Sequence, residues 1–184
     1  MKLAMLPGIT PVSLRSVEQT EQELAELIVK HRGSDSVHDP GVPIAAREVA
    51  ELAHDNGAGL AAVLAHPSAD PGLLFGVLVN TPSVPRAEDV ADLRCQLEDS
   101  GGANITEVTE TTTANGYPVV VAERIVAGEQ IRSGDFRGCQ LQAIVLDPKA
   151  PRIAVLTLNS PTGNGWLALA TLFGNLVSTV EFSN

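Results

Sequence analysis

Residues 117–177 decide the fold; they contain YPVVVAERIV (117–126), CQLQAIVL (139–146) and RIAVLTLNS (152–160), followed by GWLALATLFGNLV (165–177). The first three segments are rich in β-branched and aliphatic residues, which favours strands. The last segment repeats apolar residues at helical spacing. Three consecutive strands and a helix predict an antiparallel sheet with a helix folded back onto it.

Three more helices are predicted upstream of this stretch. The first begins at a capping box, Ser16-Val17-Glu18-Gln19, in which the serine hydroxyl accepts a hydrogen bond from a free backbone amide. The second and third are Ile44–Asn56 and Arg86–Asp99, and each ends just before glycine or a Gly-Gly pair. Residues 1–15 contain proline and glycine and are expected to be extended.

Three more strands complete the prediction. Leu60–Ala65 and Leu73–Val79 are apolar runs separated by turn residues, and we expect two neighbouring antiparallel strands near the sheet centre. Ile105–Thr112 alternates like a half-exposed strand and leads through Asn115-Gly116, a strong hairpin signal, into the strand at 117. The sequence therefore predicts one α+β domain over residues 1–184, a three-layer sandwich with about six mainly antiparallel strands flanked by helices.

Composition excludes several classes of function. The chain has a formal net charge of −10 and only six aromatic residues, one Trp, one Tyr and four Phe, which argues against a nucleic-acid-binding surface. No apolar run approaches the roughly 18 residues that a membrane span needs. Two cysteines are too few for a disulfide framework. We expect a cytoplasmic protein.

Several local phrases resemble the PsbP-like family, the sandwich shared by the oxygen-evolving subunit PsbP and the Ran-binding protein Mog, and especially its small actinobacterial members. They are AREVAELA (46–53) before the strand at 59–65, CQLQAIVLDP (139–148), AVLTLNSP (154–161) and the closing segment 166–182. The resemblance covers roughly residues 44–182. It implies a binding or assembly subunit without a shared active site, and it carries over no functional residue.

The residues themselves indicate no catalytic, cofactor or metal site. The segment Asp35–Asp39 holds two aspartates and a histidine, the densest group of metal-ligand types, but it is interpreted as a solvated turn. The four histidines are scattered, there is no Gly-x-Ser-x-Gly motif, and pairing of Cys139 with His66 has no local signature. The glycine-rich 159–165 loop lacks a P-loop lysine, so Thr162 or Asn164 is expected to cap the last helix instead.

Two regions are predicted to contact a protein partner. One is the 128–138 loop between two long strands, with Arg132, Asp135 and Arg137; the other is the acidic face of the 88–99 helix, with Glu88, Asp89 and Asp92. The hypothesis is a non-enzymatic protein-binding or assembly module. The alternatives are a small-ligand-binding protein or an enzyme with a cleft between sheet and helix, and a homo-oligomer that pairs through an exposed apolar strand such as Leu73–Val79.

Overall fold

The computed structural model describes residues 1–101, 104–127 and 137–183 of the 184-residue chain. It is an α+β fold with one antiparallel sheet of seven strands and four α-helices within the described residues. The strands are β1 (Ile9–Pro11), β2 (Leu60–Leu64), β3 (Gly72–Asn80), β4 (Ile105–Thr112), β5 (Pro118–Ala127), β6 (Arg137–Leu146) and β7 (Arg152–Ser160). The helices are α1 (Val17–Arg32), α2 (Gly41–Asp55), α3 (Asp89–Gly101) and α4 (Trp166–Ser178), with a short 3₁₀ helix, η1, at Ser34–His38.

The strand order across the sheet is β1-β2-β3-β7-β6-β5-β4, so β7 takes the central position. The expected six strands are all present, and β4 and β7 have the bounds that the sequence predicts. The seventh strand, β1, corrects the count and the expectation for residues 1–15, because Ile9–Pro11 pairs with β2. A three-residue strand with proline at its end has too weak a pattern to be recognised without its partner.

Leu73–Val79 does not form the exposed apolar edge through which the homo-oligomer alternative would pair. This segment lies within β3, which pairs with β2 on one side and with β7 on the other, so its backbone groups are not free for another chain. As predicted, β2 and β3 are antiparallel neighbours and β3 lies near the sheet centre, beside β7; β2 lies one position further out. Burial on both faces reflects the helices above and below the sheet rather than a central position.

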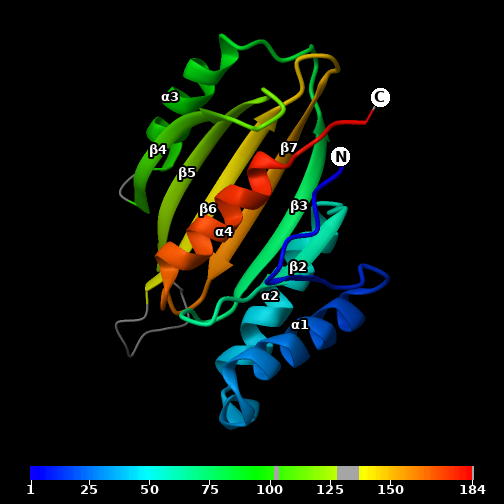
Figure 1. The fold of residues 1–184 in the computed structure, drawn as a ribbon, viewed down its shortest axis with the longest axis vertical. Helices are drawn as coiled ribbons and strands as arrows, with labels where there is room; N and C mark the ends of the chain where they lie inside the picture. The colour runs from blue at the N-terminus through cyan, green and yellow to red at the C-terminus, as the bar shows by residue number, and fades with distance from the viewer. Residues whose placement is uncertain (102–103, 128–136, 184) are drawn as a thin grey trace.

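Helix α4 packs on one face of the sheet. Phe173 and Leu176 of α4 are buried against alternate residues of the long strands, such as Leu156 and Leu158 of β7 and Ala143 of β6. Because side chains alternate across a strand, these positions define the α4 face. Figure 1 shows α4 lying across the sheet in front of β6 and β7.

The opposite face holds two separate apolar clusters. Helices α1 and α2 cover β2 and β3, where Val63, Leu73 and Phe75 are buried. Helix α3 covers Val120 and Ile144 at the other side of the sheet. In Figure 1, α1 and α2 accompany β2 and β3, whereas α3 lies beside β4 and β5. The middle of this face therefore lies between two helical covers.

Candidate functional site

The candidate site is an acidic surface formed by α3 and β4. Residues 86–114 contain seven acids and two arginines, which gives a charge of −5 and accounts for half of the net charge of the chain. The acids, which we call the acidic surface, are Glu88, Asp89, Asp92, Glu98, Asp99, Glu107 and Glu110. Strand β4 lies at the edge of the sheet and contacts α3. Glu110 faces this helix and lies near its Arg94, whereas Glu107 is opposite Glu123 and therefore lies on the α4 face of the same edge.

Two arginines neutralise part of this surface. Arg86 forms ion pairs with Glu88 and with Asp89, the latter at 3.3 Å between Nη2 and Oδ1. Arg94 lies between Glu98, 2.9 Å from its Nε, and Glu110, 3.6 Å from its Nη1. The hydrogen bond to Glu98 is the main reason why the pKa of Arg94 is raised. These pairs are exposed, so they add little stability and remain open to competition by a partner.

Asp92, Asp99 and Glu107 form no ion pair within the described residues. All three are exposed. Val90 and Leu93 of α3 point toward the sheet, so Asp92 and Asp99, seven positions apart, face solvent on the opposite side of the helix. Of the three acids predicted to contact a partner, Asp92 is therefore available to a basic side chain, whereas Glu88 and Asp89 already form ion pairs with Arg86.

The outer edge of β4 has no strand partner in the described part of the chain. Its eight residues are mostly exposed threonine and glutamate, and only Ile105 and Val108 are partly covered. Such an edge exposes backbone N–H and C=O groups that can pair with an extended segment of another protein. The sequence predicts the strand but not its edge position, which depends on pairing between distant segments.

The other predicted contact region is the 128–138 loop between β5 and β6. Arg132 and Asp135 lie outside the described residues. Arg137 is the first residue of β6 and pairs through its backbone with Ala127 of β5, and its side chain is also outside the described part. The candidate site therefore rests on α3 and β4 alone.

A cleft of about 230 Å³ lies beside β4 on the α4 face. Its floor is apolar and includes Val121, Leu141 and Phe173, and Thr111 and Ser178 supply hydroxyls at the rim. No carboxylate lines it among the described residues. The cleft is smaller than the usual range for small-molecule sites, roughly 300–1,000 Å³.

The end of the same face carries a polar contact around the only tryptophan. Trp166 is half-buried at the start of α4, and its Nε1 donates to Oε1 of Glu123 on β5 at 2.6 Å. Cys139, on the neighbouring strand β6, lies on this face too; burial of its thiol and, second, the Glu123 carboxylate raise its pKa. A raised pKa keeps the thiol protonated, so Cys139 is a poor nucleophile at neutral pH.

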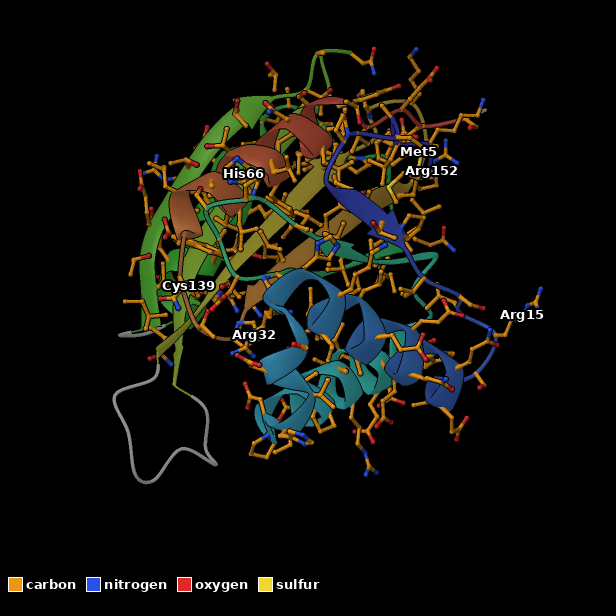
Figure 2. The ribbon with its side chains drawn as sticks, turned by 60° about the horizontal axis from the view of Figure 1, so that its bottom comes forward. Met5, Arg15, Arg32, His66, Cys139 and Arg152 are labelled. Carbon is orange, nitrogen blue, oxygen red and sulfur yellow. The ribbon has the colours of Figure 1, made fainter. Side chains whose placement is uncertain are left out.

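The remaining sequence candidates are structural. Asp39 accepts from Arg32 at 2.7 Å and from the backbone N–H of Gly41 at 2.8 Å, and no cluster of three metal-ligand side chains occurs in the described ranges. Figure 2 shows Cys139 and His66 at separate places on the molecule.

The cap expected for α4 is wrong. Its N-cap is Gly165, and Thr162 and Asn164 instead donate to Oδ2 of Asp70 at 2.8 and 3.0 Å. These two bonds join the loop before α4 to the loop between β2 and β3. Gly165 takes the cap position because its backbone is left-handed there, at φ 69°.

Comparison with known proteins identifies no family. The sequence matches no family model, and a search of curated proteins finds no significantly similar sequence. Within the described residues, no helix combines the length and the apolar character that crossing a lipid bilayer requires.

Proposed function

We propose that this chain is a non-enzymatic protein-binding or assembly module that binds a basic segment of a partner along the acidic surface. The observation that carries the proposal is the set of acids on α3 and β4, next to a sheet edge; among the described residues, three of these acids have no cation and the edge has no partner strand. A partner rich in lysine and arginine would meet complementary charge, which speeds association and sets orientation. Backbone pairing with β4 would then supply affinity.

Charge also argues against a second copy of the same chain as the partner that pairs with the edge of β4. Pairing two β4 strands would bring Glu107 and Glu110 of both copies close together, and like charges across a strand pair are destabilising. Glutamates on an edge strand are a common device against self-association. A heterologous basic partner is therefore favoured over a homo-oligomer through this edge.

The proposal includes the finer assignment of fold and compartment. We infer a three-layer sandwich of the PsbP-like kind, supported by α4 on one face and by α1, α2 and α3 on the other. We infer a cytoplasmic location, because Cys95 and Cys139 are both free thiols, as is usual in a reducing compartment.

The test compares two triple variants with equal loss of charge. Asp92→Asn, Asp99→Asn and Glu107→Gln remove the unpaired acids of the acidic surface, whereas the control removes three exposed acids near α1 and α2, namely Asp35, Glu48 and Asp55. In capture from lysate of the source cell, a stoichiometric partner should be recovered with the wild type and the control but lost with the first variant. Equal recovery by both variants would contradict the proposal.

A small-ligand or enzymatic function is the second candidate, and the cleft between α4 and the β4–β5 pair is the observation that favours it. Its apolar floor would take an apolar group and its rim hydroxyls a polar one. Widening the cleft by Phe173→Leu should strengthen binding of such a ligand in a metabolite thermal-shift screen. No stabilisation of either protein by any metabolite would leave the protein-binding function as the better proposal.

A further inference from the structure

A strip of polar side chains crosses the face of the sheet opposite α4. We call it the polar strip, and it consists of Arg124 on β5, Gln140 and Gln142 on β6, and Thr157 and Asn159 on β7. The pairing register brings these residues together: Arg124 is opposite Gln140, which is opposite Asn159. Gln142 is likewise opposite Thr157 in the next row.

The polar strip interrupts a face that is otherwise apolar. Toward α3 the next rows hold Val120, Ile144 and Val155, which belong to the cluster under that helix. Toward β3 the same rows continue as Leu73 and Phe75 under α1 and α2. The polar strip therefore borders both apolar, helix-covered regions, which meet each other at the paired residues Val77 and Val155.

Arg124 is exceptional within the polar strip because its Nε atom is buried and has no hydrogen-bond partner, the one such side-chain atom among the described residues. Of the arginine side chains that the structure describes, five form ion pairs with carboxylates, and Arg15 and Arg124 do not. Arg15 is exposed, so water solvates it, whereas Arg124 is half-buried. A buried N–H without an acceptor costs free energy, so this site favours an acceptor.

Neighbouring side chains add donors beside Arg124. Nε2 of Gln140 donates to Oδ1 of Asn159 at 2.8 Å, which leaves the Asn159 amide nitrogen available as a donor. Neither the Gln142 amide nor the Thr157 hydroxyl makes a side-chain hydrogen bond within the described residues. An arginine fork flanked by amide and hydroxyl donors on a rigid sheet is suited to an oxyanion.

We propose that the polar strip is a binding site for an oxyanion group, a carboxylate or a phosphate, held by the Arg124 guanidinium. The Nε–H and one Nη–H of Arg124 donate in parallel to two oxygens of the anion, and Asn159 or Gln142 donates to a remaining oxygen. This geometry satisfies the buried Nε atom and neutralises the unpaired cation. The site is on different side chains from the acidic surface and does not depend on the proposed function.

The experiment follows the Nε–Hε signal of Arg124 by ¹H–¹⁵N NMR in the full chain, assigned by its loss in Arg124→Lys. The titrants are succinate, inorganic phosphate and, as a neutral analogue of similar shape, succinamide. We expect a saturable shift of this signal and slower exchange of its proton with one or both anions, and no shift with succinamide. A response to succinate alone assigns a carboxylate ligand, and a response to phosphate alone assigns a phosphate ligand.

Two arginine-to-glutamine variants, each of which removes one positive charge, test whether Arg124 holds the anion. Arg124→Gln should weaken the affinity for the anion by roughly tenfold to a hundredfold, the range for loss of a charge-assisted bidentate pair. Arg15→Gln removes an exposed, unpaired arginine, which projects from the surface before α1 in Figure 2, and should leave affinity unchanged. An Nε–Hε signal that neither anion moves, or equal weakening in both variants, would overturn the proposal.

Discussion

The buried ion pair between Asp147 and Arg152 tests how the turn between β6 and β7 is held to the C-terminal segment. Oδ2 of Asp147 lies 2.7 Å from Nε of Arg152, and the Asp147 side chain is only 1% exposed. Arg152 also donates from Nη2 to the backbone carbonyl of Ser183 at 2.7 Å, and its guanidinium lies 5.4 Å from the centre of the Phe182 ring. One arginine therefore joins the β6–β7 turn to the C-terminal segment, at the position labelled in Figure 2.

The cost of breaking this pair depends on which partner is removed. Arg152→Met leaves a buried carboxylate that keeps one hydrogen bond, from the backbone N–H of Lys149 at 2.9 Å. Removing one partner of a buried ion pair costs about 3–5 kcal/mol. Asp147→Asn should cost less, roughly 1–3 kcal/mol, because the Arg152 side chain is 22% exposed and water can solvate it. The double variant should be more stable than the sum of the two losses implies, since no unpaired charge remains.

Urea unfolding followed by circular dichroism measures these free energies. For a domain of this size, the loss in Arg152→Met corresponds to a fall in Tm of roughly 10 °C. The matched control is Arg47→Met, which breaks an exposed pair with Glu51 and should cost about 0.3–0.5 kcal/mol. If Arg152→Met costs no more than Arg47→Met, or if the double-variant cycle is additive, the pair does not stabilise the fold as argued.

Three further predictions concern single residues. Gly116→Ala should lower the free energy of unfolding by about 1 kcal/mol, because φ is 79° there although the new Cβ meets open space. Gly165→Ala should lower it clearly more in the same assay, because its Cβ would lie 2.3 Å from a backbone oxygen. Iodoacetamide at pH 8 should alkylate exposed Cys95 before Cys139, whose pKa is raised by burial; equal rates by mass spectrometry would contradict this. The pKa of Asp39 is lowered from 3.8 by hydrogen bonds from the backbone N–H of Gly41 and from Arg32, so its contribution to stability is complete above pH 4 and decreases as pH falls through the lower folded pKa. In urea titrations, Asp39→Asn should therefore lose more stability at pH 6 than at pH 3.

Local patterns predicted the elements well where the physical signal is local. The serine half of the capping box is confirmed, because the Ser16 hydroxyl accepts from the backbone N–H of Gln19 at 3.2 Å. The other half is wrong, because the Gln19 side chain does not reach back to Ser16 but donates forward to Glu23 at 2.9 Å. The hairpin turn at Asn115-Gly116 is confirmed as well, with positive φ at Gly116. Helix α3 begins at Asp89 rather than Arg86, because Asp89 accepts from the backbone N–H of Arg86 and holds the preceding residues in a turn.

Position within the sheet was not predictable from such patterns. An apolar run such as β3 looks the same at the centre or at an edge, because burial on both faces comes from the helices and not from the neighbouring strands. The edge position of β4, which defines half of the acidic surface, follows only from pairing between distant segments. The predicted cap of α4 is wrong for a related reason. Asp70 lies ninety-two residues before Thr162 in the sequence, and it accepts hydrogen bonds from the side chains that were expected to cap the helix.

The polar strip could have been found in part from sequence. In CQLQAIVL the two glutamines are two residues apart, and in RIAVLTLNS the threonine and asparagine are as well, so each pair shares a face of its strand. What the sequence does not contain is the register that aligns both pairs with Arg124. Nor does it show that Arg124, unlike five other arginines, forms no ion pair with any carboxylate that the structure describes.

The acidic surface is proposed to bind a positively charged partner and the polar strip a negatively charged group. Each proposal can therefore be tested by a substitution that should not weaken binding at the other site. In water, one charge about 10 Å away contributes roughly 0.4 kcal/mol before screening by salt. Glu107 is opposite Glu123, the residue next to Arg124 in β5, so removing it should have a small effect on anion binding. Removing Asp92, Asp99 and Glu107 should therefore abolish capture of a basic partner while slightly strengthening anion binding at Arg124. Arg124→Gln should weaken anion binding by roughly tenfold to a hundredfold and leave capture of the partner intact. If one substitution weakened both, the two sites would not be separate, and a single partner contacting β4 and β5 together would explain the data better.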